Sequence, residues 1–240
     1  MRATLNCDMG ESFGLYRVGD DAGLMPHVTH ANVACGFHAS DPDHMRATVA
    51  LAQRHGVAVG AHVAFPDLQG FGRRAMAVGR EEAVNFMTYQ VGALTGFLTL
   101  LGAPALTHLK PHGALYGVAA RERHVAEAVA DVALAFDLPV FGLAGTLHET
   151  VAAERGARFV AEFFADLDYD AAGRLIITRS HHAVDPEAAA ARARRAVEAG
   201  VVASAGGGDV PVRAETVCVH SDTPNAVAVA RAVRAALAPR

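Results

Sequence analysis

The sequence predicts an α/β fold in which a mostly parallel sheet is closed, or nearly closed, into a barrel. Short apolar segments alternate with amphipathic helical segments along the chain, a pattern typical of parallel sheets. Seven strand-like segments suffice for a barrel surrounded by helices, and a doubly wound open sheet is the alternative. The length of 240 residues and the 52% hydrophobic content suit one large core. We therefore expect a single domain over residues 1–240.

The predicted strands are short, mostly apolar or β-branched, and bounded by glycine, proline or polar residues. The glycine-rich stretch Ala203–Asp209 is predicted to be a loop and not a domain boundary. The seven predicted strands are Ala3–Cys7, Thr29–Ala34, Val57–Ala61, Ala105–Leu109, Pro139–Leu143, Arg158–Phe163 and Thr216–Val219.

The predicted helices lie between these strands, and several carry end signals. Asp41 and Asp185 each precede a proline, a pair typical of an N-cap and the first helical residue. Gly56, Gly102 and Gly200 follow the last helical positions, where glycine readily ends a helix. The six helices are Asp41–His55, Arg80–Leu101, Arg121–Phe136, Thr146–Arg155, Asp185–Ala199 and Thr223–Leu237.

Composition excludes several classes of function. The formal net charge is -4 and the basic residues are scattered, so no nucleic-acid partner is expected. Cys7, Cys35 and Cys218 are far apart and form no paired motif, which argues against a disulfide scaffold or a zinc–thiolate site. A predicted strand begins almost at once, without a signal peptide, and no apolar run reaches membrane-spanning length. We therefore expect a cytoplasmic protein without a membrane partner.

Reactive side chains follow nearly every predicted strand. Functional groups in parallel α/β folds collect at the carboxyl ends of the strands, so these side chains are expected to converge. A purely structural scaffold has no need for such regularly placed ionisable groups, and we therefore predict an enzyme. In chain order the groups are Asn6, Asp8 and Glu11; Cys35 and His38; His62 and Asp67; His108, Lys110 and His112; Glu162 and Asp166; and His220 and Asp222.

Four of these residues are predicted to be catalytic: Asp8, His62, Lys110 and His112. Lys110 is the only lysine among 21 Lys and Arg residues, which indicates a position that needs an ammonium group or a shiftable pKa. A compositional bias towards arginine is the alternative. His108 shares a strand face with Lys110 and is predicted to be a core histidine with its hydrogen bonds satisfied.

Other polar groups are predicted to bind the substrate or a phosphate. Arg73 and Arg74 end the glycine-rich loop 66–74 and are candidates for an anion clamp, because arginine binds phosphate and carboxylate through paired hydrogen bonds. A solvated surface pair is the alternative. The predicted binding residues are Asn6, Glu11, His38, Arg73, Arg74, Asp166, His220 and Asp222.

Cofactors are less well defined by the sequence. The chain contains no GxxxxGK[ST] phosphate-binding loop, so an ATP site would be unusual or would belong to a partner chain. Asp8, His38 and His62, together with His112, could ligate a metal at a barrel mouth. No HExxH or paired-cysteine spacing supports such a site, and no metal is predicted.

Several motifs resemble, in the same order, those of the lactam-utilisation family, from residue 5 to about residue 230. The motifs are Leu5–Glu11, Ala31–His38, Gly60–His62, Phe65–Arg74, Lys110–Tyr116, Phe164–Asp166, and Cys218–His220 with Asp222 and Pro224. The sequence departs from the family pattern at His30 (usually Ser), Ser40 (usually Gly), Val63 (usually Pro), Leu167 (usually Arg) and Ser221 (usually Gly).

The resemblance implies a seven-stranded, distorted (β/α) barrel like those of glycoside hydrolases and deacetylases. It also implies ATP-dependent cleavage of 5-oxoproline (pyroglutamate) to L-glutamate, in a complex with 5-oxoprolinase subunits B and C. On this hypothesis Asp8 or His62 is the general base for water, while Lys110 and His112 stabilise charge on the oxygen or phosphoryl group. The Arg73–Arg74 pair would hold the phosphate or the substrate carboxylate.

Two other functions remain open at this level. A metal-dependent amide hydrolase, similar to a deacetylase, would share the barrel and its Asp and His residues. A non-catalytic lactam-binding subunit, whose partners perform the chemistry, is the second alternative. Tightly bound metal would favour the first, and substrate binding without turnover would favour the second.

Overall fold

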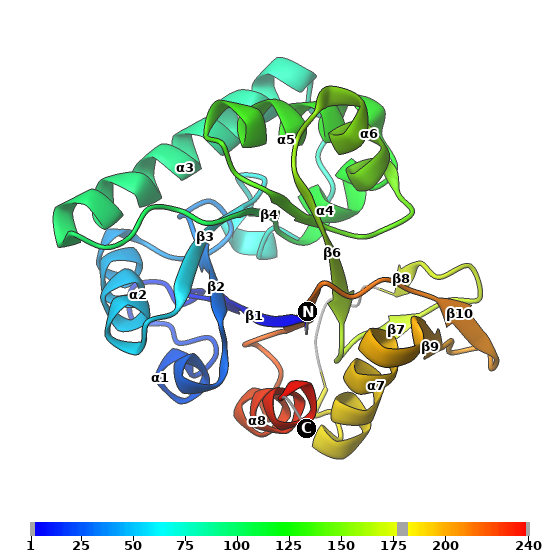
Figure 1. The fold of residues 1–240 in the computed structure, drawn as a ribbon. Helices are drawn as coiled ribbons and strands as arrows, with labels where there is room; N and C mark the ends of the chain where they lie inside the picture. The colour runs from blue at the N-terminus through cyan, green and yellow to red at the C-terminus, as the bar shows by residue number, and fades with distance from the viewer. Residues whose placement is uncertain (1–2, 177–181, 239–240) are drawn as a thin grey trace.

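Seven strands form a closed parallel barrel at the centre of the protein (Figure 1). The computed structural model describes residues 3–176 and 182–238. The strand order is β1-β11-β6-β5-β4-β3-β2, with β1 pairing both β11 and β2 to close the sheet. This confirms the predicted barrel over the open sheet. The barrel strands are β1 (Thr4–Met9), β2 (His30–Ala34), β3 (Ala58–Val63), β4 (Leu109–Pro111), β5 (Val140–Gly142), β6 (Phe159–Phe164) and β11 (Thr216–Val219).

Helices cover the outside of the barrel, and α7 and α8 pack against each other, with α8 against β1 and β11 and α7 against β6 (Figure 1). Two short 3-10 helices, η1 (Met25–His27) and η2 (Leu68–Gly70), lie in the loops. Among the described residues the α-helices are α1 (Asp21–Leu24), α2 (Pro42–His55), α3 (Arg80–Leu101), α4 (Gly113–Ala119), α5 (Arg123–Ala135), α6 (Leu147–Arg155), α7 (Pro186–Ala199) and α8 (Ala226–Leu237).

The predicted helix ends are confirmed where the sequence carries capping residues. The Asp41 side chain accepts hydrogen bonds from the N–H groups of Asp43 and His44, at 2.9 and 3.0 Å, and so satisfies two of the free donors at the start of α2. Gly56 ends the same helix with a φ of 64°, a left-handed conformation that glycine adopts without steric cost.

Three predicted boundaries were wrong. The helix predicted from Thr223 begins at Ala226. The strand predicted over Ala105–Leu109 is Leu109–Pro111, because its pairing with β3 runs only from Leu109 opposite Ala61 to Pro111 opposite Val63. The helix predicted over Arg121–Phe136 begins at Arg123 and is preceded by the unpredicted helix α4. Helix α4 begins at a glycine, which in sequence resembles a turn.

Two small antiparallel hairpins lie outside the barrel beyond β6 (Figure 1). One pairs β7 (Asp168–Tyr169) with β8 (Leu175–Ile176), and the other pairs β9 (Val201–Ala203) with β10 (Asp209–Pro211). The predicted glycine-rich loop is the turn of the second hairpin. These strands were not predicted, because two or three residues are too few to show a periodic pattern.

Alternation along the barrel strands separates an apolar outer layer from a polar interior. In β1, Leu5 and Cys7 pack in the hydrophobic core under the helices, whereas Asn6 and Asp8 reach groups across the barrel. Successive side chains of a strand point to opposite faces. The interior of the barrel is therefore a polar layer of side chains beneath the carboxyl ends of the strands.

Helix α3 has the length and apolar composition of a helix that could cross a membrane, so the expectation that no apolar run reaches that length was too strong. Its buried residues Ala83, Met87, Val91 and Leu94 recur every three to four positions, which is the pattern of one packed helix face. The helix packs against α2, α5 and β3. It thus serves as one of the helices that cover the barrel.

Candidate active site

The floor of the site is a set of amide and imidazole side chains inside the barrel. Asn32 donates to Asn6 Oδ1 at 2.8 Å and to Asp8 Oδ1 at 2.7 Å. Its own Oδ1 lies 2.7 Å from Nε2 of His108, whose ring is stacked on Phe141. His108 is fully buried with both ring nitrogens hydrogen-bonded, as predicted for a core histidine. This layer fixes the position of Asp8 from below.

Lys110 is the positive centre of the interior, and its side chain is 2% exposed. Its Nζ lies 2.8 Å from Asp8 Oδ1, 3.0 Å from Glu162 Oε1 and 3.0 Å from Cys218 Sγ. Burial opposes the charge, but the surrounding Asp8, Cys218 and Glu162 hold the pKa of Lys110 well above its usual value. The ammonium group is therefore a fixed point charge that a planar guanidinium could not replace in this space.

Asp8 is an ionised carboxylate between Lys110 and His62. Its Oδ2 lies 3.3 Å from Nε2 of His62, opposite the oxygen that faces Lys110. Burial favours the neutral acid, yet His62 and Lys110 hold the pKa of Asp8 well below its usual value. The carboxylate thus carries its charge at neutral pH and is available to accept a proton.

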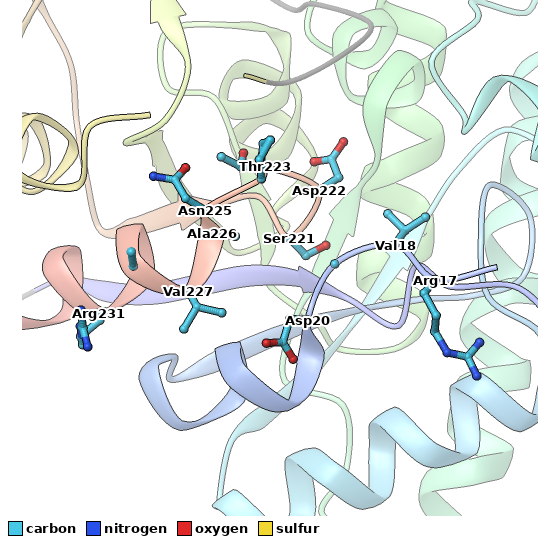
Figure 2. A pocket seen from close by; sticks show the side chains of 13 residues that line it. Arg17, Val18, Asp20, Ser221, Asp222, Thr223, Asn225, Ala226, Val227 and Arg231 are labelled. Carbon is cyan, nitrogen blue, oxygen red and sulfur yellow. The ribbon is translucent and has the colours of Figure 1, made fainter. Parts of the chain in front are cut away.

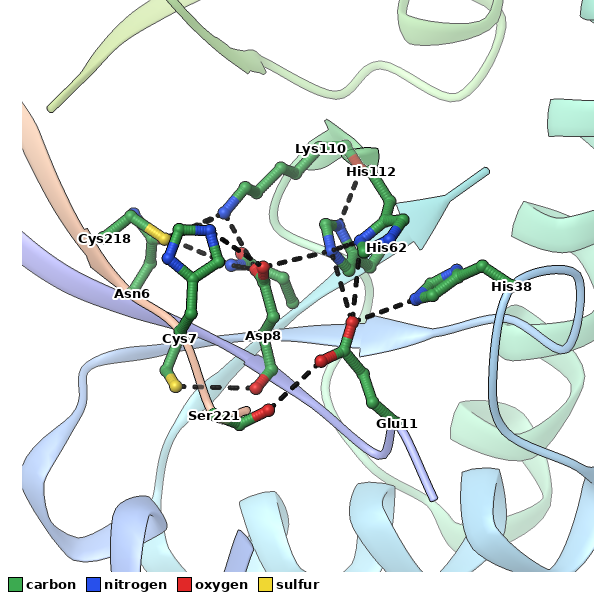
Figure 3. A network of polar contacts seen from close by, with 12 residues as sticks. Asn6, Cys7, Asp8, Glu11, His38, His62, Lys110, His112, Cys218 and Ser221 are labelled. Atoms are coloured by element: carbon green, nitrogen blue, oxygen red, sulfur yellow. Dashed lines mark hydrogen bonds and ion pairs between the residues drawn. The ribbon is translucent and has the colours of Figure 1, made fainter. Parts of the chain in front are cut away.

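Glu11 and three histidines form a second cluster next to Asp8 (Figure 3). Glu11 Oε1 lies 3.0 Å from His38 Nε2, 3.5 Å from His112 Nδ1 and 4.0 Å from His62 Nε2. The facing nitrogens of His62 and His112 are 3.0 Å apart. Burial, with the neighbouring histidines, holds the pKa of both His38 and His112 well below the usual value. Burial likewise raises the pKa of Glu11.

His220 and Asp166 form an ion pair at the other side of the interior. Asp166 Oδ1 lies 3.0 Å from His220 Nδ1, and Asp166 Oδ2 accepts the backbone N–H of His220 at 2.7 Å. Burial alone would lower the pKa of His220, but the Asp166 carboxylate raises it to about 9. The ring stacks on Phe164 with its Nε2 3.9 Å from Asp8 Oδ2. A second cation therefore faces Asp8 at neutral pH.

The two predicted clamp arginines point in different directions. Arg73 Nη2 lies 2.7 Å from Asp222 Oδ2, which links the loop after β3 to the loop after β11. Arg74 instead pairs with Asp67, and its side chain is 56% exposed. The structure therefore brings Arg73 to the central site and places Arg74 outside it.

The reactive groups surround a narrow central cavity of about 40 Å³. Its polar lining includes Asp8, His62, Lys110, His112 and His220, and its apolar side includes Phe164 and Leu167.

A wider hollow of about 730 Å³ lies between the loop 17–20 and the segment 221–228, which includes the start of α8 (Figure 2). Arg17 and Arg231 line this hollow. The four catalytic candidates line the narrow cavity. Of the predicted site residues, only Asp222 borders the wide hollow.

Sequence reasoning found most of this constellation and missed some of its members. Asn32, Cys218 and Ser221 were not predicted as site residues, and Glu162 was noted only as a strand-end group. Asn32 and Cys218 lie in interior-facing register with Asp8 and Asn6, so strand alternation was the available signal. The catalytic and binding roles of the individual residues stay predictions.

Comparison with known proteins places the chain among close relatives. The LamB/YcsF family profile matches residues 3–240. A Thermus thermophilus protein named as the A subunit of 5-oxoprolinase is 50% identical, over 99% of this chain and 96% of its own. A protein of the same name from Syntrophobacter fumaroxidans is 46% identical, over 99% and 95%. The crystal structure of a lactam utilization protein from Thermus thermophilus is 48% identical, with a TM-score of 0.91, over 99% of this chain and 96% of that one.

Proposed function

The chain belongs to the LamB/YcsF family. We propose that it is the A subunit of an ATP-dependent 5-oxoprolinase. This enzyme opens the ring of 5-oxoproline to give L-glutamate. The observation that carries the proposal is 46 to 50% identity, over nearly the whole chain, to proteins that bear this subunit's name. The buried cavity lined by Asp8, Lys110 and His220 supports it, because perturbed ionisable groups in a cavity are typical of active sites.

The reaction needs an activated amide, because an unstrained lactam is a poor electrophile. Transfer of the γ-phosphoryl group from ATP to the lactam oxygen releases ADP and makes the ring carbon electrophilic. Water then adds to this carbon and gives up a proton, and the ring C–N bond breaks as the nitrogen is protonated. The acyl phosphate that remains is hydrolysed by a second water to glutamate and phosphate.

Asp8 is the best-placed general base for the attacking water, since it is ionised, borders the cavity and keeps Oδ2 clear of Lys110. Lys110 stabilises negative charge on the oxygen or phosphoryl group. Arg73, which borders the same cavity, holds the substrate carboxylate or the phosphate. Arg74 has no part in this assignment, because it lies outside the cavity.

Partner subunits complete the enzyme in this proposal. The relatives are named as one lettered subunit of an enzyme, which implies further subunits, and we assign these as subunits B and C. Because the sequence has no phosphate-binding loop of the common type, we assign ATP binding at least in part to these partners. The free thiols of the three cysteines and the need for ATP suit the cytoplasm.

The direct test is glutamate release from 5-oxoproline, with and without ATP, by this chain alone and mixed with candidate B and C subunits. We expect ATP-dependent release only in the mixture. The matched variants are Lys110→Ala, which should abolish release, and His55→Ala, an exposed histidine whose loss should leave it unchanged. ATP-independent hydrolysis of another amide would instead support the metal-dependent hydrolase, and 5-oxoproline binding without turnover in any mixture would support the binding subunit.

A further inference from the structure

We propose that Glu11, His38, His62 and His112 form a binding site for one divalent transition-metal ion of the zinc class. All four side chains are buried, and one donor atom from each lies within 4.8 Å of the others. They come from the loop after β1, the loop after β2, strand β3 and the residue after β4. The proposal concerns metal binding itself and does not depend on the proposed function.

The distances within the cluster fit a small coordination shell. Zinc bonds of about 2.0 to 2.1 Å in a tetrahedron place neighbouring ligand atoms about 3.3 to 3.4 Å apart. The separations between donor atoms are 3.0 Å for Glu11 and His38, 3.5 Å for Glu11 and His112, 4.0 Å for Glu11 and His62, and 3.0 Å for His62 and His112. These values lie on both sides of the tetrahedral spacing, so small side-chain movements would complete the shell.

The hydrogen bonds on the far side of two rings fix their tautomers. His62 Nδ1 lies 3.1 Å from the Lys110 carbonyl, and His112 Nε2 lies 2.8 Å from the Phe71 carbonyl. A carbonyl only accepts, so each of these nitrogens carries the proton and donates. When both rings are neutral, the remaining nitrogens, His62 Nε2 and His112 Nδ1, face each other with lone pairs at 3.0 Å. A cation between them converts this repulsion into ligation, and metal-binding histidines are oriented by such carbonyl partners.

The charge of the cluster also calls for a cation. Glu11 pairs with the three histidines, and no lysine or arginine among residues 3–176 and 182–238 forms an ion pair with it. A divalent ion would supply the missing positive charge, and ligands of the N₃O type suit zinc, iron or cobalt.

The neighbouring trio of Asp8, Cys218 and His220 also converges, but a cation already occupies that part of the interior. The Lys110 ammonium lies 2.8 Å from Asp8 Oδ1 and 3.0 Å from Cys218 Sγ. Protonated His220 adds a second positive charge. The geometry therefore favours the cluster that includes Glu11, in which His62 and His112 serve as ligands and Asp8 remains the proton acceptor.

The packing around the cluster holds the rings in place. Gly72 has a φ of 65°, and a Cβ added there would lie 2.7 Å from both His112 Cδ2 and His38 Cβ. The loop backbone therefore rests directly on the two rings, which are stacked with centroids 3.7 Å apart. Ser221 donates to Glu11 Oε2 at 3.1 Å and orients the carboxylate. Such support from surrounding groups is typical of metal sites.

The test is metal binding by the full chain after chelation and dialysis, measured with Zn²⁺ by calorimetry and elemental analysis and with Co²⁺ by visible absorption. We expect one ion per chain and the intense d–d bands of four-coordinate Co²⁺. His38→Ala and Glu11→Gln should each weaken Zn²⁺ binding by at least about 100-fold, since loss of an outer-shell partner alone costs 10- to 100-fold. The control His55→Ala removes an exposed histidine and should bind like the wild type.

Absence of Zn²⁺ and Co²⁺ binding by the folded wild-type chain would overturn the proposal. So would unchanged affinity in both His38→Ala and Glu11→Gln, or a near-ultraviolet thiolate–Co²⁺ band, which would show that a cysteine outside the proposed cluster is a ligand. Circular dichroism of each variant separates lost binding from lost folding, and the conservative Glu11→Gln keeps the side-chain shape. Because no readout uses 5-oxoproline, a failure here is distinct from a failure of the proposed function.

Discussion

Lys110 shows at the scale of one residue how charge is distributed in the barrel. Its ammonium lies between two buried carboxyl groups, those of Asp8 and Glu162, and contacts the thiol of Cys218. A buried carboxylate without a counter-charge is costly. The position therefore has a structural role in addition to its proposed catalytic one, and a substitution should affect both stability and activity.

Replacing Lys110 by methionine should lower the free energy of unfolding by about 3 to 5 kcal/mol, because Glu162 loses its ion-pair partner and Asp8 loses the nearer of its cations. Activity of the assembled enzyme should fall by at least about 100-fold. The double variant Lys110→Met, Asp8→Asn should regain part of the stability and none of the activity. Urea denaturation and the glutamate assay measure the two effects, and an unchanged unfolding midpoint in the single variant would contradict the prediction.

His220 should make stability depend on pH. Burial alone lowers its pKa, but Asp166, helped by Asp8 and opposed by Lys110, raises it to about 9. The folded pKa lies above the unfolded value of about 6.5. The stabilisation is therefore complete below about pH 6.5 and is lost as the pH rises through about 9, a change of about 3 kcal/mol. Denaturation of the wild type should show a lower free energy of unfolding at about pH 9.5 than at about pH 6, and the difference should be smaller in His220→Gln. Equal differences in the two proteins would refute the prediction.

At the scale of the element, each barrel strand combines an apolar outer face with a polar inner face, and the inner face has little space. In β3, Gly60 and His62 face the interior, while Val59 and Ala61 lie in the apolar layer. Glycine is needed at position 60 because the imidazole of His108 occupies the space that a side chain would fill.

Gly60→Ala should therefore destabilise the protein by about 3 kcal/mol or more, the upper part of the range for overpacking. The added Cβ would lie 2.1 Å from Nε2 of His108, which is held by its bond to Asn32. Gly92→Ala is the matched control, because Gly92 is exposed in α3 with no atom within 4 Å of the position that a Cβ would occupy. Gly92→Ala should raise the free energy of unfolding by about 0.5 to 1 kcal/mol. Thermal melting of both variants distinguishes them by opposite shifts.

The loop before α2 contains a residue with a strained backbone. Ser40 has a φ of 74°, in the left-handed region that glycine adopts without steric cost. A non-glycine residue in this conformation costs about 1 to 2 kcal/mol. We expect Ser40→Gly to raise the unfolding free energy by about 0.5 to 1 kcal/mol after the entropy of glycine in the unfolded chain is subtracted.

The comparison for Ser40→Gly is Ala47→Gly, at an exposed position inside α2. Residue 47 is helical, so glycine relieves no strain there. The low helix propensity of glycine should lower the unfolding free energy by about 1 kcal/mol. Guanidinium titrations of the two variants should move the midpoint in opposite directions. A lower midpoint for Ser40→Gly would mean that the serine side chain contributes more than its backbone strain costs.

At the scale of the whole molecule, the fold depends on the seam where the first and last strands meet. Thr216 of β11 lies opposite Thr4 in register, and its hydroxyl lies 2.9 Å from the Thr4 hydroxyl and 2.9 Å from Asn6 Nδ2. Contacts between residues so far apart in sequence form only when the barrel closes. A substitution in this seam therefore tests the stability of the whole barrel.

Thr216→Val should lower the unfolding free energy by about 1 to 3 kcal/mol, because it removes the acceptor for buried Asn6 and leaves that amide unsatisfied. The control is Thr99→Val on the exposed side of α3, which should change stability by less than about 0.5 kcal/mol. Both proteins should unfold in one transition when followed by circular dichroism and by tyrosine fluorescence. Two separate transitions would refute the prediction of a single domain over residues 1–240.

Much of the fold and of the site could be predicted because local signals agreed. The caps at Asp41 and Gly56, the alternation of segments, and the polar groups after each strand all depend on neighbouring residues. Strand β4 was misplaced and helix α4 was missed, since three paired residues and a glycine start give weak local signals. Arg73 and Arg74, adjacent in sequence, were treated alike, but only Arg73 borders the cavity, and the sequence does not record side-chain direction.

Local sequence patterns were enough to predict the α/β class, the seven barrel strands in order, and most of the chemical groups at the strand ends. These properties follow from side-chain periodicity and from residues that start or end helices. Only the tertiary structure decided which groups meet: that Lys110 lies against Asp8 and Glu162, and that Glu11 faces three histidines. Barrel closure brings strands from both ends of the chain together, and burial then sets the charge of each group.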